Sequence, residues 1–384
     1  MTQGQLDFIN LIKSAVNQEK TVFPHRIDWD EVYILSRKHS VIPILYSAIR
    51  LNSLEAPNDF MNSLKGEYYS IICRHTNQQY WAQQVFAELE NNHVKYMPLK
   101  GIVIYNIYPM EEMRTSCDID IFFDKKRLET IKEIAKKYNL IFVEKGENHY
   151  VYCKDNVLFE FHYALTPPNE FLKKYYRNIW NKLINKNGFR FDFSPEDHYI
   201  YLLLHFVKHF LNGGGGIRAL LDIYLYDKRY ELNREYIKKE LQKLGLCKFH
   251  AVIQKTANVL FGNIEGDEET DRIAGFIVSC STYGSAKIAV STKYHSSSKY
   301  TSKISYLQYR VFPPMEKMKN MYSILSKVPL LLPFFWVVRW FDVLFTRRER
   351  IKTVFETSQQ ISVEHSLYEI LKSVDLDKTI SRYY

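Results

Sequence analysis

The 384-residue sequence predicts an α+β protein in which a short mixed sheet with helices lies between two helical regions. Apolar residues recur at helical spacing up to about residue 90 and again from about residue 194. Between these limits, short alternating segments separated by turn residues are typical of strands. Hydrophobic residues make up 46% of the chain, which excludes a disordered protein. We therefore expect a helical region at 1–90, an α/β core at 91–193 and a second helical region at 194–384.

The N-terminal region predicts helices because its apolar residues keep the spacing of a single helix face. Between Leu6 and Val16 they recur every three or four positions. Asp28 then precedes the segment WDEVYILSRKH and has Glu31 three residues further on, which is typical of an N-terminal capping box. A third helical stretch covers 60–89.

The central region alternates strand-like with helix-like segments. The segment DIDIFF at 118–123 alternates polar with apolar residues, as a half-buried strand does. Asp155 and Asn156 form a two-residue turn signal that predicts a hairpin between the strands on either side. The expected strands are 94–98, 118–123, 140–144, 150–154 and 157–163, and the expected helices are 102–108 and 125–138.

The C-terminal region is expected to be mainly helical. Ser194 and Pro195 introduce a long helix that ends near Leu211. His205 and His209 lie four residues apart in it and therefore share a helix face. Helix packing is the favoured interpretation of this pair. Zinc binding, for which no third ligand is evident, and contact with a substrate are the alternatives.

The aromatic segment 328–345 predicts a buried core helix, with peripheral contact to a membrane surface as the alternative. Its longest apolar run, VPLLLPFFWVV, holds two prolines and is shorter than the roughly 20 residues that a membrane-spanning helix needs. Since the N-terminal residues also lack the basic and apolar parts of a signal peptide, we expect a cytoplasmic protein.

The charge and cysteine content narrow the classes of partner. A net charge of +9 favours anionic partners, but the lysines are scattered, so nucleic-acid binding is not expected. The five cysteines are odd in number and no two have CxxC spacing. This argues against a disulfide framework and against a zinc ribbon.

Three carboxylates form the candidate site. Asp118 and Asp120 lie two residues apart on one strand and therefore project from the same face, where they repel each other unless a cation lies between them. Glu160 and His162 share one face of the strand LFEFHY, between apolar neighbours. If Glu160 meets the two aspartates, the three can hold Mg²⁺ or Mn²⁺. The alternatives are a solvated surface pair at Asp118 and Asp120 and a lysine partner for Glu160.

Upstream of these acids, Lys100 and Gly101 lie between a strand and a helix. Gly101 allows the backbone to approach a phosphate, the helix start offers N–H groups, and Lys100 adds a cation. Arg114 can pair with a carboxylate or a phosphate in bidentate fashion. The other interpretation of Lys100-Gly101 is an ordinary turn.

The segment LKGIVIYNIYPMEEMRTSCDIDIFF, followed by LFEFHY, resembles the polymerase-beta-like nucleotidyltransferases. It is most similar to the bacterial, uncharacterised branch with an L-K-G motif, an arginine shortly before D-I-D, and a later acidic-x-His strand. The close resemblance covers Val94 to Tyr163, and segments such as HFVKHF and GGIRALLD extend it into the C-terminal half.

The resemblance implies a nucleotidyltransferase core with two Mg²⁺ or Mn²⁺ ions, catalytic residues Asp118, Asp120 and Glu160, and nucleoside triphosphates such as ATP as substrates. Lys100, Gly101, Arg114 and His162 are the expected nucleotide-binding residues. The acceptor is open among small molecules, saccharides and proteins. The alternative function is a nucleotide-sensing or partner-binding module on the same fold, with little turnover.

Overall fold

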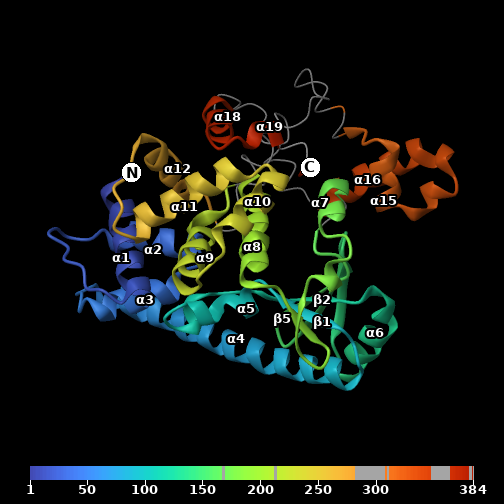
Figure 1. Cartoon of the computed structure of the whole chain (residues 1–384), viewed down its shortest axis with the longest axis horizontal. Coiled ribbons are helices and arrows are strands. Elements are labelled where there is room, and N and C mark those ends of the chain that lie inside the picture. The colour runs from blue at the N-terminus through green and yellow to red at the C-terminus, as the bar shows by residue number, and fades with distance from the viewer. Residues whose placement is uncertain are drawn as a thin grey trace.

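The protein is seen here in a computed structural model that describes residues 1–166, 169–211, 214–281, 308, 311–346, 364–379 and 383. In this part of the chain one mixed sheet is flanked by helices (Figure 1), which confirms the predicted α+β class. Asp28 caps the second helix by accepting the Glu31 N–H, which confirms the N-cap, but the Glu31 carboxylate accepts from the Thr2 hydroxyl and does not complete the expected capping box. The helices before the sheet are α1 (Gln3–Asn17), α2 (Trp29–Lys38), α3 (Ile42–Leu51) and α4 (Asn58–Asn91).

Seven strands form the sheet, in the order β3-β4-β5-β2-β1-β7-β6. β2 runs parallel to β5 and β1 parallel to β7, whereas every other neighbouring pair is antiparallel. The parallel pairing of β2 with β5 brings together two segments that lie about forty positions apart in the chain. The strands are β1 (Tyr96–Leu99), β2 (Asp118–Phe123), β3 (Ile141–Lys145), β4 (His149–Lys154), β5 (Val157–His162), β6 (Ile184–Asn187) and β7 (Arg190–Asp192).

The two faces of the sheet differ in chemistry. One face carries Ile119, Ile121 and Phe159, which are buried against α4 and α6 (Leu128–Lys137). Figure 1 shows α4 running along this side. The other face has an apolar part, where Leu99 packs with residues that include Tyr201 of α8 (Pro195–Leu211). Because side chains alternate along a strand, the polar residues of β2 and β5 lie on this second face.

Short helices connect the strands, and longer ones follow the sheet. Those within the sheet region are α5 (Gly101–Ile104), α7 (Glu170–Tyr175) and the 3₁₀ turns η1 (Tyr105–Ile107), η2 (Glu111–Met113), η3 (Lys125–Arg127) and η4 (Ile179–Asn181). After α8 come α9 (Gly216–Arg229), α10 (Arg234–Leu244), α11 (Cys247–Phe261), α12 (Glu268–Ser279), α15 (Met315–Met321), η5 (Ser323–Ser326), η6 (Pro329–Leu331), α16 (Leu332–Thr346), α18 (Glu364–Ser373) and α19 (Leu376–Thr379).

The helices on both sides of the sheet in the sequence share one hydrophobic core. Phe8 of α1, Leu45 of α3, Phe210 of α8 and Phe249 of α11 all belong to it. The three-region division of the chain stays a prediction, but the first and last regions pack together in space.

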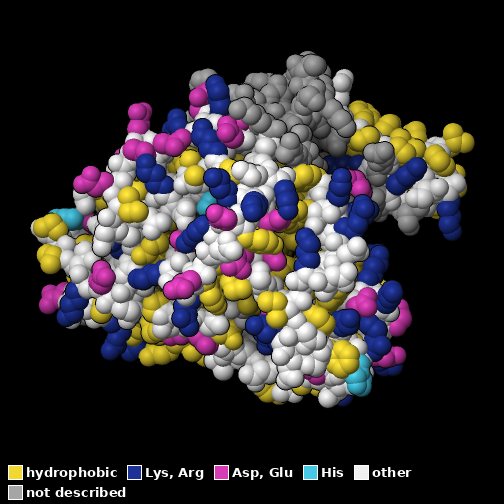
Figure 2. Space-filling model, in the orientation of Figure 1, with side chains coloured by type: hydrophobic (Ala, Val, Ile, Leu, Met, Phe, Trp, Pro, Cys, Tyr) yellow, Lys and Arg dark blue, Asp and Glu magenta, His cyan; other side chains and the backbone are white. Residues whose placement is uncertain are grey.

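The expectation of a buried core helix at 328–345 is wrong. None of the residues between 328 and 342 is buried, and Phe334 is 61% exposed. Figure 2 shows hydrophobic side chains gathered over α15 and α16, whereas lysine and arginine side chains are dispersed over the face in view. Apolar composition alone did not predict burial here, because the described neighbours, such as Phe312 and Tyr322, cover only part of the segment.

In the described residues, no helix combines the length and the apolar character that a membrane span requires. All five cysteines have free thiols.

Candidate functional site

The three predicted carboxylates converge on the polar face of the sheet. Asp120 of β2 lies opposite Glu160 in the parallel β5 strand, and Asp118 lies two residues before it on the same face. One ligand oxygen from each of the three lies within 4.8 Å of the others. This spacing suits a divalent cation that prefers oxygen ligands, such as Mg²⁺ or Mn²⁺.

Of the three acids, Asp120 makes the closest contacts with cationic or hydrogen-donating side chains. Its Oδ1 accepts a hydrogen bond from Lys100 Nζ at 2.5 Å and lies 2.8 Å from His162 Nε2, and the residue is only 2% exposed. Burial alone would favour the neutral acid, but Lys100 and His162 outweigh it and hold the pKa of Asp120 below its usual range. The ammonium of Lys100 thus stands where a metal cation could bind.

Asp118 and Glu160 have different surroundings. The Ser116 hydroxyl donates to Asp118 Oδ1 at 2.9 Å, but burial and the nearby Asp120 raise the pKa of Asp118. Glu160 is more open, with 23% of its side chain exposed, and lies 3.2 Å from His162 Nε2. Burial opposes its ionisation, yet the contact with His162 lowers the pKa of Glu160 overall. A cation between the acids would relieve the repulsion that Asp118 experiences.

Lys100 reaches Asp120 from an unusual backbone conformation. It connects β1 to α5 with φ 51° and ψ −126°, outside the left-handed helical region that non-glycine residues with positive φ usually occupy. Such strain is typical of residues that a site holds in place. Gly101 follows, and a Cβ atom on it would lie 2.8 Å from Ser116 Oγ, so a side chain would collide with the loop before β2.

Arg114 pairs with a carboxylate. Its Nε and NH2 groups donate to the two carboxylate oxygens of Asp222 in α9, at 2.7 and 2.8 Å, and NH1 donates to the Thr115 carbonyl. Tyr108 OH also donates to Asp222, at 2.6 Å. The bidentate pairing with a carboxylate was one of the two predicted options. It anchors the loop before β2 to the helices behind it.

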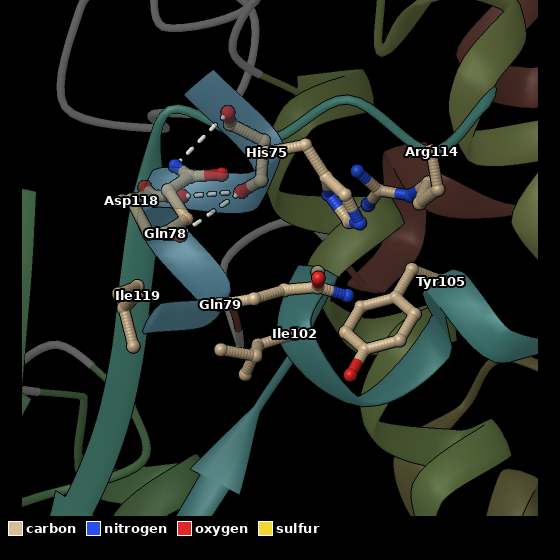
Figure 3. Close-up of a pocket in the computed structure, with 10 residues that line it drawn as sticks. His75, Gln78, Gln79, Ile102, Tyr105, Arg114, Asp118 and Ile119 are labelled. Atoms are coloured by element: carbon tan, nitrogen blue, oxygen red, sulfur yellow. Dashed lines mark hydrogen bonds between the residues drawn. The ribbon is translucent and has the colours of Figure 1, made fainter. Parts of the chain in front are cut away.

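A narrow pocket lies beside Asp118, between α4 and α5 (Figure 3). Its lining includes Gln79, Tyr105 and Arg114, and it has room for about one water molecule. It is therefore too small to accept a nucleobase without movement of its walls. Gln78 closes one side by donating to the Ser116 carbonyl at 3.1 Å.

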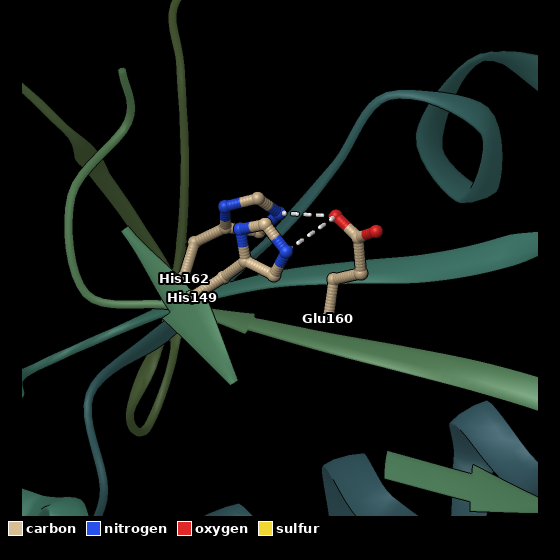
Figure 4. Close-up of side chains that lie close together, drawn as sticks. All are labelled: His149, Glu160 and His162. Atoms are coloured by element: carbon tan, nitrogen blue, oxygen red, sulfur yellow. Dashed lines mark ion pairs between the residues drawn. The ribbon is translucent and has the colours of Figure 1, made fainter. Parts of the chain in front are cut away.

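Two residues of the site were not found from the sequence. His149 of β4 lies opposite His162 across the β4–β5 hairpin, and its Nε2 is 3.9 Å from Glu160 Oε2 (Figure 4). Asn148, which is buried, lies between the two rings on their Nδ1 side. The signal was present, because the two-residue turn at 155–156 fixes the register, and counting back from it pairs His149 with His162. Burial lowers the pKa of His149.

One face of α8 lies near Lys100 and the carboxylates. Tyr201, His205, Lys208 and His209 recur at helical spacing, and all four lie within electrostatic range of Lys100. The Nε2 atoms of His205 and His209 are 2.9 Å apart, which is a hydrogen bond between two neutral rings. Burial lowers the pKa of His209 to about 4. His205 and His209, which the sequence placed on one helix face, therefore lie near the site. In the described residues, neither belongs to a group of three possible metal ligands.

Comparison with known proteins identifies a family that the chain matches. The sequence model of a protein family described as uncharacterised nucleotidyltransferase matches residues 25–262, which include the whole sheet, the carboxylates and α8 to α11. No curated protein and no solved structure matches the chain.

Proposed function

Because the chain belongs to the uncharacterised nucleotidyltransferase family, we propose that it transfers a nucleoside monophosphate from a nucleoside triphosphate to an acceptor. One observation carries this proposal: the oxygens of Asp118, Asp120 and Glu160 converge within 4.8 Å next to the cationic side chain of Lys100. Acids in this arrangement suit divalent cations, and a lysine beside them suits a triphosphate.

In the proposed reaction an acceptor oxygen attacks the α-phosphorus. The bond between that oxygen and phosphorus forms, the bond to the β-phosphate oxygen breaks, and pyrophosphate leaves with the released electron pair. Glu160, the most exposed of the three acids, helps to remove the acceptor proton. Divalent cations, when bound, neutralise the charge that develops on the phosphates.

The chain's own side chains hold the substrate. Asp118 and Asp120 provide the oxygen ligands, and Lys100 moves from Asp120 to the triphosphate when a cation takes its place. α5 has only four residues, so Lys100 supplies most of the positive charge on this side. Lys208, near Glu160 and Lys100 on α8, contacts the triphosphate or the acceptor.

Labelled transfer tests this function directly. The protein is incubated with Mg²⁺, cell extract as a source of acceptors, and each of the four nucleoside triphosphates labelled at the α-phosphate. We expect one of them to label an acceptor. We expect Asp120→Asn to reduce labelling by several orders of magnitude. Asp192→Asn, which changes an acid of β7 away from the site, is the matched control and should keep the parent's activity.

Nucleotide binding separates an enzyme from a binding module. Lys100→Met should weaken Mg²⁺–nucleotide binding by about 1–3 kcal/mol, the usual value of a charge-assisted hydrogen bond. It should tighten Mg²⁺ binding in the absence of nucleotide, because the cation no longer competes with the ammonium for Asp120. Calorimetry on the parent and on Lys100→Met measures the two effects. Lys126→Met, which changes an exposed lysine, is the control. Nucleotide binding without transfer to any acceptor would favour the sensing module.

A further inference from the structure

A second group of possible metal ligands adjoins the three carboxylates. His149, His162 and Glu160 each offer one ligand atom, and these atoms also lie within 4.8 Å of one another. Figure 4 shows both imidazole rings directed at the same carboxylate oxygen, Glu160 Oε2. Two nitrogens and one oxygen form a ligand set different from the all-oxygen set of Asp118, Asp120 and Glu160.

Hydrogen bonding fixes the orientation of the His149 ring. Asn148 Nδ2 donates to the Ala164 carbonyl at 2.8 Å, which identifies it as the amide nitrogen. The amide oxygen of Asn148 therefore faces His149 Nδ1 at 3.1 Å and accepts its hydrogen. In a neutral ring this leaves the lone pair on His149 Nε2. A metal-binding imidazole usually donates its other N–H to a fixed acceptor, and the oxygen of the buried Asn148 amide provides such an acceptor here.

The distances leave a gap for a cation. His149 Nε2 lies 3.9 Å from Glu160 Oε2, which is too far for a hydrogen bond, so a nitrogen lone pair faces a carboxylate oxygen at a distance that coordination to one cation can bridge. His162 Nε2 is 3.2 Å from the same oxygen. Two ligands of a tetrahedral cation with bonds of about 2.1 Å lie about 3.4 Å apart. Coordination therefore requires small adjustments of the rings and loss of the hydrogen that His162 Nε2 shares with Asp120 Oδ1, 2.8 Å away.

Access from solvent is open on the His149 side. The side chains of His149 and Glu160 are 20% and 23% exposed, whereas that of His162 is 7% exposed. Gly146 contributes to this arrangement, because a Cβ atom on it would lie only 2.4 Å from the His149 ring. The ring thus fills the space that a side chain at 146 would take, and a cation bound to it would keep positions for water or substrate.

We propose that His149, His162 and Glu160 bind one divalent cation of the borderline class, such as Mn²⁺, Co²⁺ or Zn²⁺, in preference to Mg²⁺. Imidazole nitrogens suit these cations, while Mg²⁺ retains oxygen ligands. The site shares Glu160 with the carboxylate group, so its role in catalysis rests on the proposed function, but the binding of the cation does not. The protein would then work with two chemically different cations.

Titration with metal alone tests this site. Metal-free protein is titrated with Co²⁺, Mn²⁺ and Mg²⁺ by calorimetry, and the visible absorption of bound Co²⁺ is recorded. We expect His149→Asn to weaken Co²⁺ and Mn²⁺ binding at least about tenfold and to change the Co²⁺ spectrum. Its Mg²⁺ affinity should stay within about twofold of the parent's. His149→Gln is the second variant, and thermal melts show that each is folded.

Two control variants test whether histidines outside the proposed site bind the cation. His25→Asn removes a ring that also contacts a carboxylate, Asp7, at 2.8 Å, and it should keep the parent's binding. His209→Asn removes the neighbouring pair on α8. If His209→Asn abolishes the Co²⁺ spectrum while both His149 variants retain it, the cation belongs to α8 and the proposal is wrong.

Two further results would show that the proposed cation site is wrong. Parent-like Co²⁺ affinity in both His149 variants would overturn the proposal, and so would an equal loss of Co²⁺ and Mg²⁺ binding. A parallel titration with Mg²⁺ and nucleoside triphosphate keeps the two hypotheses apart. If no nucleotide binds to the parent, the proposed function fails, but a Co²⁺ site that depends on His149 still stands.

Discussion

Asp118 and Asp120 lie two residues apart on one strand, yet their carboxylates are in opposite electrostatic situations. Asp120 contacts two cationic or hydrogen-donating groups, Lys100 and His162. Asp118 has one hydroxyl partner, Ser116, and burial together with the charge of Asp120 outweighs the favourable charge of Lys100. Folding therefore favours the charged form of Asp120 and disfavours the charged form of Asp118. The two residues should respond differently to loss of charge even though both are proposed metal ligands.

Neutralising each aspartate separately should expose this difference. In metal-free protein, Asp120→Asn should lower the free energy of unfolding by about 3 kcal/mol, because it leaves buried cationic groups without their partner. Asp118→Asn should leave stability unchanged or slightly higher, because it removes repulsion. Thermal melts in the presence of a chelator measure both effects, and transfer activity should be lost in both variants. Equal stability of Asp120→Asn and the parent would show that the Lys100 contact does not form in solution.

Among the secondary-structure elements, the β4–β5 hairpin was the most predictable from sequence. Asp155 and Asn156 both have positive φ, as a two-residue hairpin turn requires, and the turn fixes the register of the two strands. Both helix starts with a clear cap signal, before Trp29 and at Pro195, were also found. Local chemistry determines these features, so a short stretch of sequence contains the information.

Features that depend on distant contacts did not follow from local sequence patterns, and the meeting of Glu160 with the two aspartates was expected only because the sequence resembles a known family. The pairing of Asp120 with Glu160 joins two parallel strands that the β3–β4 region separates in sequence. β6 and β7 have only four and three residues, too few for a pattern that predicts a strand. Arg114 could be assigned a bidentate anion, but the choice of Asp222, more than a hundred residues later, required the fold.

The Arg114–Asp222 pair connects the loop before β2 to α9, so it should control the position of the whole element that carries the aspartates. Both side chains are nearly buried, at 9% and 10% exposure. Asp222→Asn and Arg114→Lys should each lower the free energy of unfolding by about 3–5 kcal/mol, because a buried charge loses its bidentate partner.

Chemical denaturation measures this loss, and nucleotide titration of the folded variants provides the comparison. A structural role predicts similar changes in nucleotide affinity for both variants. If Arg114→Lys weakens nucleotide binding by more than tenfold relative to Asp222→Asn, Arg114 contacts the phosphate directly, and the original expectation for this residue is restored.

At the scale of the whole molecule, one buried histidine ties the N-terminal helices to the C-terminal ones. His39 follows α2, is fully buried and stacks on Phe8 of α1, with ring centroids 5.6 Å apart. Its Nδ1 accepts the Ile217 N–H of α9 at 3.2 Å, and its Nε2 donates to the Val278 carbonyl of α12 at 3.0 Å. Both nitrogens are thus used by helices about 180 residues or more further along the chain.

This arrangement makes the joined helical core sensitive to acid. Burial lowers the pKa of His39 from 6.5 to about 4, because a charged ring would lose solvation and Nδ1 would lose its role as an acceptor. The folded chain therefore binds this proton less tightly than the unfolded chain. Stability from His39 is fully present above pH 6.5 and is lost as the pH falls from 6.5 towards 4, by up to about 3 kcal/mol.

Replacing His39 with glutamine should distinguish its contribution to the pH dependence of stability from the contributions of the other buried histidines. At pH 7 we expect His39→Gln to be less stable than the parent by about 1–3 kcal/mol, since it cannot make both hydrogen bonds in the same geometry. Between pH 6.5 and 4 its stability should fall less steeply than the parent's, so the two curves should approach each other. Denaturant titrations at half-unit pH steps give these curves.

Hydrogen exchange of the His39→Gln variant at pH 7 should be faster than that of the parent in α1, α9 and α12 alike, because all three helices meet at this ring. Parallel pH profiles, or faster exchange confined to α1, would show that the two helical regions do not depend on this contact.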